Sequence, residues 1–148
     1  MTTPDFELAL RIYWEDTDAG GVVFYANYLK FFERARTEWM RGLGFGQERM
    51  RLETNAVFVV SDTTVRYLRP ARLDDLLRVT VRQVQLARAS ITLGQQAWCG
   101  ETLLAESSIR IACVDAGSFQ PRRIPEEIAA AAVGSNRSPA SNPLNQKA

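Results

Sequence analysis

The sequence contains no histidine among its 148 residues. Histidine is the side chain whose ordinary pKa allows it to exchange a proton near neutral pH. Its absence excludes serine–histidine–aspartate and cysteine–histidine catalysis, and it also excludes zinc sites built on imidazole. Any acid–base step must therefore use Asp, Glu, Tyr, Cys or Lys.

Cysteine is also scarce, with only Cys99 and Cys113 in the chain. Two cysteines without histidine indicate neither a disulfide framework nor a metal site. We expect both to be buried strand residues of a cytoplasmic protein. Neither is a good candidate nucleophile, because no general base or basic neighbour that would activate it is evident.

Long apolar runs and an excess of one charge are missing as well. No segment approaches the roughly 20 apolar residues of a membrane span, and residues 1–14 do not resemble a signal peptide. The net charge is +1, which indicates no general attraction to nucleic acid or to an anionic membrane. We therefore expect a cytoplasmic protein with no membrane span, no nucleic-acid partner and no metal.

Two hydrophobic periodicities occupy the first part of the chain. Apolar residues alternate along residues 8–14, which predicts a strand that buries Leu8, Leu10, Ile12 and Trp14. From about Tyr25 the spacing changes to three and four, which predicts a long helix. Asn27 is a candidate cap for this helix and Gly42 or Gly44 a candidate end. Its apolar residues are Tyr28, Leu29, Phe31, Phe32, Ala35, Trp39, Met40 and Leu43.

The rest of the chain predicts strands, and the expected ranges are 56–68, 77–86, 89–99 and 103–114. The apolar set shifts between Val81 and Val84, which predicts a bulge. Short helices are expected at 47–52 and within 121–133, and residues 134–148 are expected to form a disordered tail. The long helix has no partner helix and must be covered by the sheet. We predict one α+β domain, residues 1–133, with a curved antiparallel sheet wrapped around one long central helix.

The loop before the long helix combines a carboxylate with glycines. Residues 15–21 read E-D-T-D-A-G-G, and Gly20 and Gly21 let a backbone approach a ligand closely. The loop runs into a helix, whose first N–H groups lack partners and favour negative charge. A carboxylate beside such donors can support the hydrolysis of an acyl compound. The carboxylate supplies a nucleophile or base, and the N–H groups supply a site for the oxyanion.

Three segments resemble the 4-hydroxybenzoyl-CoA thioesterase family. They are residues 15–28, E-D-T-D-A-G-G-V-V-F-Y-A-N-Y, residues 31–36, F-F-E-R-A-R, and residues 65–75, V-R-Y-L-R-P-A-R-L-D-D. Together they are most similar to the subgroup associated with the Tol-Pal envelope system, over roughly residues 6–128. The resemblance implies a hotdog fold, hydrolysis of acyl-CoA without metal or cofactor, and a homodimer or homotetramer with active sites between subunits.

The resemblance also implies roles for individual residues. Asp18 would be the catalytic nucleophile or general base, and Asp16 would order the loop. The backbone N–H of Tyr25 would polarise the thioester carbonyl, although members of this subgroup often carry histidine at that position. The alternatives are that Asp18 only holds the turn and that the Tyr25 ring only packs.

Substrate contacts are expected at two places in the sequence. Gly21 and Val22 lie in the loop itself. Arg88 and Ser90 lie near a bend between two strands, where the family implies contacts with the CoA phosphates. The alternative for Arg88 and Ser90 is an ordinary solvated turn.

Glu33 lies within the buried helix, where a carboxylate needs partners. We expect it to support the structure through Arg36 or Arg72, with an indirect catalytic role as the alternative.

Other functions remain compatible with this sequence. The chain could hydrolyse acyl groups carried by acyl-carrier protein. It could also be an interaction partner of an envelope or lipid-synthesis complex with weak hydrolase activity. A hydratase of the same fold is disfavoured, because such enzymes use a histidine.

Overall fold

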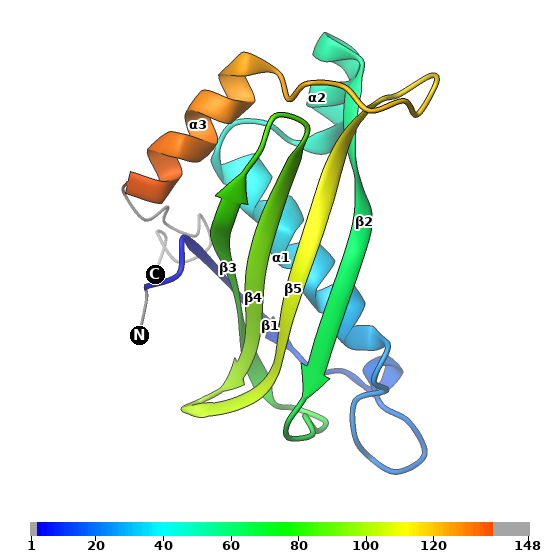
Figure 1. Ribbon diagram of the computed structural model, residues 1–148. Helices are drawn as coiled ribbons and strands as arrows, with labels where there is room; N and C mark the ends of the chain where they lie inside the picture. The colour runs from blue at the N-terminus through cyan, green and yellow to red at the C-terminus, as the bar shows by residue number, and fades with distance from the viewer. Residues whose placement is uncertain (1–2, 138–148) are drawn as a thin grey trace.

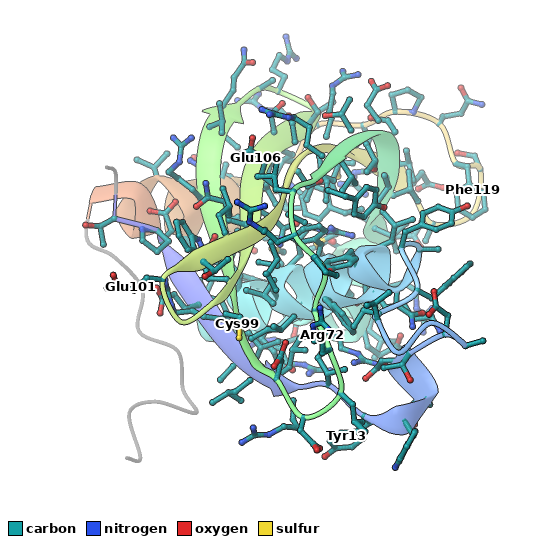
Figure 2. All side chains as sticks on the ribbon, turned by 90° about the horizontal axis from the view of Figure 1, so that it is seen from below. Tyr13, Arg72, Cys99, Glu101, Glu106 and Phe119 are labelled. Carbon is teal, nitrogen blue, oxygen red and sulfur yellow. The ribbon has the colours of Figure 1, made fainter. Side chains whose placement is uncertain are left out.

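A five-stranded antiparallel sheet with strand order β1-β3-β4-β5-β2 forms the body of the protein. The computed structural model describes residues 3–137. The sheet curves around α1, and this is the predicted α+β arrangement (Figures 1 and 2). The elements are β1 (Phe6–Arg11), a 3-10 turn (Trp14–Asp16), α1 (Asn27–Gly42), α2 (Gln47–Thr54), β2 (Ala56–Tyr67), β3 (Leu76–Leu86), β4 (Ser90–Cys99), β5 (Thr102–Asp115) and α3 (Glu126–Arg137).

The apolar spacing predicted for α1 buries one broad face of this helix against the sheet. Its buried residues are Tyr28, Phe31, Phe32, Ala35, Trp39 and Met40. Leu29, one of the apolar residues noted in the sequence of this helix, is 44% exposed, because it lies on the side that the sheet does not cover. The helix ends at Gly42 as predicted. The chain then turns through Gly44, whose positive φ of 94° favours glycine.

The start of α1 differs from the prediction. Ala26, not Asn27, is the N-cap, and no side chain caps the helix. Ala26 already has helical angles (φ −71°, ψ −18°), so it lacks the extended backbone from which a capping side chain reaches the first N–H groups. The Asn27 amide instead donates to the Asp16 carbonyl oxygen at 2.8 Å. The beginning of the helix is thereby fastened to the preceding loop.

Trp14 is a second correction, because it is 79% exposed and not part of the buried face of β1. β1 ends at Arg11, and the last buried residue of the alternation is Ile12. The Asp16 carboxylate then accepts the Tyr13 N–H at 2.9 Å. This contact closes the 3-10 turn and ends the two-residue period.

The strand register shifts at three places in the sheet. The pairing of β3 with β4 shifts between Gln83 and Gln85, as the sequence predicts. Two further shifts, which were not predicted, lie between Val60 and Asp62 on β2 and between Ala97 and Trp98 on β4. Bulges increase local twist and bend a strand, which helps the sheet wrap around α1.

The C-terminal helix α3 extends to Arg137, beyond the expected domain end at residue 133. Ile128 and Ala132 bury its inner face. The expected tail overlaps α3 at residues 134–137, and its remainder, 138–148, lies outside the described residues. Among residues 3–137, no helix is both long and apolar enough to cross a membrane.

A buried polar contact joins α1 to the sheet. The Gln95 side chain of β4 is only 1% exposed. Its oxygen accepts Arg36 Nη1 at 3.0 Å, and its nitrogen donates to the carbonyl oxygens of Phe32 and Thr80 at 3.0 and 3.3 Å. Burial lowers the pKa of Arg36, because it disfavours the charged guanidinium. The hydrogen bond to Gln95 offsets part of this cost.

We expect Gln95→Ala to lower the free energy of unfolding by about 1–3 kcal/mol, because the buried Arg36 guanidinium loses its acceptor. Urea denaturation monitored by circular dichroism measures the change. Gln95→Glu keeps an acceptor for Arg36 but turns an oxygen toward the carbonyl oxygens of Phe32 and Thr80, so it separates loss of the donor from loss of the acceptor. Wild-type stability in Gln95→Ala would show that the contact contributes nothing.

Glu33 makes no close ion pair with Arg36 or Arg72, although its charge acts on Arg36 and raises the pKa that burial lowers. Its carboxylate accepts the Thr37 hydroxyl one turn further along α1. The expected ion pair does not form because Arg36 points into the interface with β4, whereas Glu33 is exposed.

Candidate active site

Residues 17–23 form a tight hairpin. Thr17 pairs with Val23, the Asp18 N–H donates to the Val22 carbonyl oxygen at 2.9 Å, and the Gly21 N–H donates to the Asp18 carbonyl oxygen at 3.0 Å. Gly21 has a φ of +81°, a conformation that residues with a side chain adopt at a cost. The glycine expected to contact substrate thus also shapes the turn.

Asp18 presents its side chain at the tip of this hairpin and is exposed. Its Oδ1 accepts the Gly20 N–H at 2.8 Å. A carboxylate oriented in this way can act as nucleophile or base through its other oxygen. An aspartate that only stabilises the turn would make the same contact. Only a measurement of catalytic activity distinguishes the two roles.

Asp16 ties the loop to the body of the protein. Besides the contact of its carboxylate with Tyr13, its carbonyl oxygen accepts the Phe24 N–H at 3.0 Å and the Asn27 amide at 2.8 Å. Asp16 orders the loop as predicted.

The turn before α1 carries two backbone donors with no acceptor. The Phe24 carbonyl oxygen accepts the Asn27 N–H at 2.8 Å. The Tyr25 carbonyl oxygen accepts the Tyr67 hydroxyl at 3.0 Å and the Tyr28 N–H at 3.4 Å. Within residues 3–137, the N–H groups of Tyr25 and Ala26 have no hydrogen-bond acceptor. Adjacent free donors at the positive end of a helix suit an anion.

A pocket of about 280 Å³ lies beside this turn. Its tyrosine rings meet edge to face, with centroids 6.0 Å apart for Tyr25 and Tyr67 and 5.5 Å apart for Tyr28 and Tyr67. The sequence singled out Tyr67 only through its place in the segment 65–75. The pocket is lined by Val23, Tyr25, Tyr28, Tyr67, Leu68, Arg69 and Pro70.

A larger hollow of about 510 Å³ lies on the sheet, among residues such as Arg66, Arg82 and Trp98. It contains none of the expected site residues. The smaller pocket is therefore the candidate site, since it adjoins the free donors and the Asp18 hairpin.

Arg88 and Ser90 lie at the other end of the sheet. Ser90 of β4 and Val59 of β2 both pair with Ala112 of β5, so they lie at the same height in the sheet. Tyr67 lies eight residues further along β2. At the rise of an antiparallel strand this is about 26 Å. Ser90 is also buried. A single chain therefore does not bring Arg88 or Ser90 to Asp18.

Neither cysteine is suited to act as the nucleophile. Cys113 is buried and Cys99 is partly buried, and desolvation is the largest cause raising the pKa of both thiols. A thiol with a raised pKa is a poor source of thiolate. The part of the chain that the structure describes contains no group of three or more His, Cys, Asp or Glu placed to hold a metal ion.

The sequence matches the thioesterase-like superfamily over residues 12–132, which include the hairpin, α1 and the pocket. The chain belongs to this superfamily. The acyl-CoA thioesterase YbgC of Haemophilus influenzae is 42% identical over 131 residues, which are 88% of this chain and 96% of that protein.

Solved structures agree with membership of the thioesterase-like superfamily. A probable thioesterase from Bartonella henselae has a TM-score of 0.77 and 34% identity, covering 80% of this chain and 98% of its own. The DHNA-CoA thioesterase of Staphylococcus aureus has a TM-score of 0.82 and 20% identity, covering 95% and 93%, and it shows the shared fold alone. The predicted hotdog fold is confirmed, while the roles of Asp18 and Tyr25 remain predictions.

Proposed function

We propose that the chain hydrolyses acyl-CoA thioesters to a free acid and CoA. The observation that carries the proposal is the pair of free N–H groups at Tyr25 and Ala26, next to an apolar pocket and directly after the Asp18 hairpin. The relatives named as acyl-CoA thioesterases support the substrate class. We place the reaction in the cytoplasm, where the free Cys99 and Cys113 would stay reduced.

In this mechanism the acyl group enters the pocket and the thioester oxygen accepts hydrogen bonds from Tyr25 and Ala26. These donors stabilise the negative charge that develops as the carbonyl becomes tetrahedral. Asp18 either attacks the carbonyl, giving an anhydride that water then hydrolyses, or removes a proton from an attacking water. In both routes the carbon–sulfur bond breaks and CoA leaves as the thiolate. Gly21 and Val22 shape the approach to the carbonyl.

The proposal includes assembly into a homodimer through β2. This 12-residue strand is an edge of the sheet, and most of it is exposed. Long bare edges are templates for pairing with another chain, and proteins avoid leaving them open. Antiparallel pairing of β2 with its copy would continue the sheet across a two-fold axis. Two such dimers could form a tetramer.

Such a dimer would also explain the position of Arg88. Antiparallel pairing brings the β3–β4 hairpin of one subunit to the same end of the joined sheet as the Asp18 hairpin of the other. The Tyr67 end of β2 and the copy's β4 would be three strands apart, about 14 Å at the usual spacing. An extended CoA could span that distance, with its phosphates near Arg88 of the partner subunit; the buried Ser90 would help to shape this end of the strand.

Arg88→Ala is therefore expected to raise KM roughly 10–100-fold with little change in kcat, because a charged hydrogen bond of about 1.5–3 kcal/mol is lost equally from bound substrate and transition state. Steady-state kinetics on the best acyl-CoA measure this. Arg34→Ala, at an exposed arginine of α1, is the matched control. An unchanged KM would remove Arg88 from the site.

A panel of aliphatic and aromatic acyl-CoAs, with thiol release as the readout, tests the function itself. The same acyl groups on acyl-carrier protein distinguish the carrier-protein alternative. We expect turnover of at least one acyl-CoA well above the uncatalysed rate. Background rates on the whole panel would contradict the proposal and favour a role as an interaction partner.

A further inference from the structure

Tyr67 is the last residue of β2 and is held by the sheet. It pairs with Ala105 of β5, and the next N–H, that of Leu68, donates to the Leu104 carbonyl oxygen at 2.8 Å. Its ring is packed edge to face against Tyr25 and Tyr28. The phenol is therefore presented to the turn before α1 from a rigid element.

The Tyr67 hydroxyl donates to the Tyr25 carbonyl oxygen at 3.0 Å, across 42 residues of sequence. That carbonyl and the Ala26 N–H belong to the same peptide group, which is planar. A bond that fixes one end of this group therefore fixes the direction of the other. The only other donor to this carbonyl within residues 3–137 is the Tyr28 N–H, at a longer 3.4 Å, so Tyr67 makes the better hydrogen bond.

The Tyr67 contact also affects the strength of the Ala26 donor. Hydrogen bonds in a chain polarise one another, by about 10–30% per bond. Donation into the carbonyl thus makes the Ala26 N–H a better donor to an anion. Desolvation, followed by the nearby Tyr25, raises the pKa of the Tyr67 phenol. The hydroxyl therefore keeps its proton at neutral and mildly alkaline pH.

We propose that Tyr67 is a positioning residue of the oxyanion site: its hydroxyl orients and polarises the Tyr25–Ala26 peptide so that the Ala26 N–H points at the thioester oxygen. This inference rests on the proposed function. It assigns a specific task to the Tyr67 side chain, which reaches this turn from the edge strand β2.

Tyr67→Phe removes the hydroxyl and keeps the ring. We expect kcat to fall roughly tenfold while KM stays within about twofold, because one donor is misdirected but present. Complete loss of an oxyanion donor typically costs about 10²–10³-fold. Tyr67→Leu should be at least as impaired. Tyr13→Phe, the same change at an exposed tyrosine that points away from the body of the protein (Figure 2), should keep wild-type kcat.

A structural role would move other observables. The thermal midpoint of Tyr67→Phe should stay close to that of the wild type, and the amide resonance of Ala26 in ¹⁵N–¹H spectra should shift more than those of residues outside the turn. If Tyr67→Phe kept the wild-type kcat while Tyr67→Leu lost it, only the ring would matter. That result would overturn the role of the Tyr67 hydroxyl and leave the proposed function standing. A wild-type chain inactive on every acyl-CoA would overturn the proposed function and the catalytic role of Tyr67 together.

Discussion

Asp18→Asn is expected to lower kcat by roughly 10²–10⁴-fold, the usual cost of losing a general base. Loss of a covalent route would cost more. The amide oxygen of the new side chain can still accept the Gly20 N–H that Asp18 Oδ1 accepts at 2.8 Å. The substitution therefore keeps the turn and removes only basicity and nucleophilicity. Steady-state kinetics on the best acyl-CoA, with thermal midpoint and oligomeric state as checks on folding, measure the effect.

Two neighbouring substitutions make the Asp18 result specific. Asp16→Asn should be milder, because its amide oxygen can still accept the Tyr13 N–H. Tyr25→Phe should also be mild, because the donor proposed there is the backbone. If Asp18→Asn kept most of its kcat, Asp18 would be a turn residue and the mechanism would be wrong. If Tyr25→Phe were the crippled variant, the phenol would have an acid–base role.

If the proposed dimer forms through β2, Val60→Lys should convert it to monomers and abolish activity. Val60 is 51% exposed on the edge strand β2, and lysine on an edge strand opposes pairing with a second chain. Light scattering at micromolar concentration measures the mass, and acyl-CoA hydrolysis measures the consequence. Val84→Lys, at an exposed valine of the inner strand β3, should leave the dimer intact. A wild-type chain that is monomeric would contradict the proposed assembly.

Mixed dimers test whether the site is shared between subunits. Refolding Asp18→Asn and Arg88→Ala chains together in equal amounts should give about a quarter of all sites with both wild-type residues, because Asp18 and Arg88 of one site come from different chains. kcat/KM at low substrate should then exceed the mean of the two separate variants. No gain on mixing would place both residues in one subunit or remove Arg88 from the site.

Local patterns predicted much of the fold. The three- and four-residue spacing from Tyr28 to Met40 predicted α1 and its buried face, and the shift after Val81 predicted the bulge of β3. The alternating pattern led to the wrong prediction that Trp14 is buried. The strand gives way to a short 3-10 turn, but the apolar spacing continues into that turn. Period alone cannot show where a strand stops.

Contacts between distant segments could not be predicted in the same way. Tyr67 reaches Tyr25 across 42 residues and Arg36 reaches Gln95 across 59. Both contacts depend on how the sheet wraps around α1, and no spacing within one segment encodes that geometry. The resemblance pointed to Asp18 and Arg88 as parts of one site, but only the strand register shows that one chain holds them at opposite ends.

The Asp18 hairpin has a thermodynamic consequence for binding. Three internal hydrogen bonds already hold residues 18–22 in the free protein. Ordering a loop residue costs about 1–2 kcal/mol in backbone entropy, and a loop that is ordered before the ligand arrives does not add this cost to binding. A substrate should therefore meet this part of the site preassembled, and calorimetry should show little of the entropy loss that accompanies loop closure.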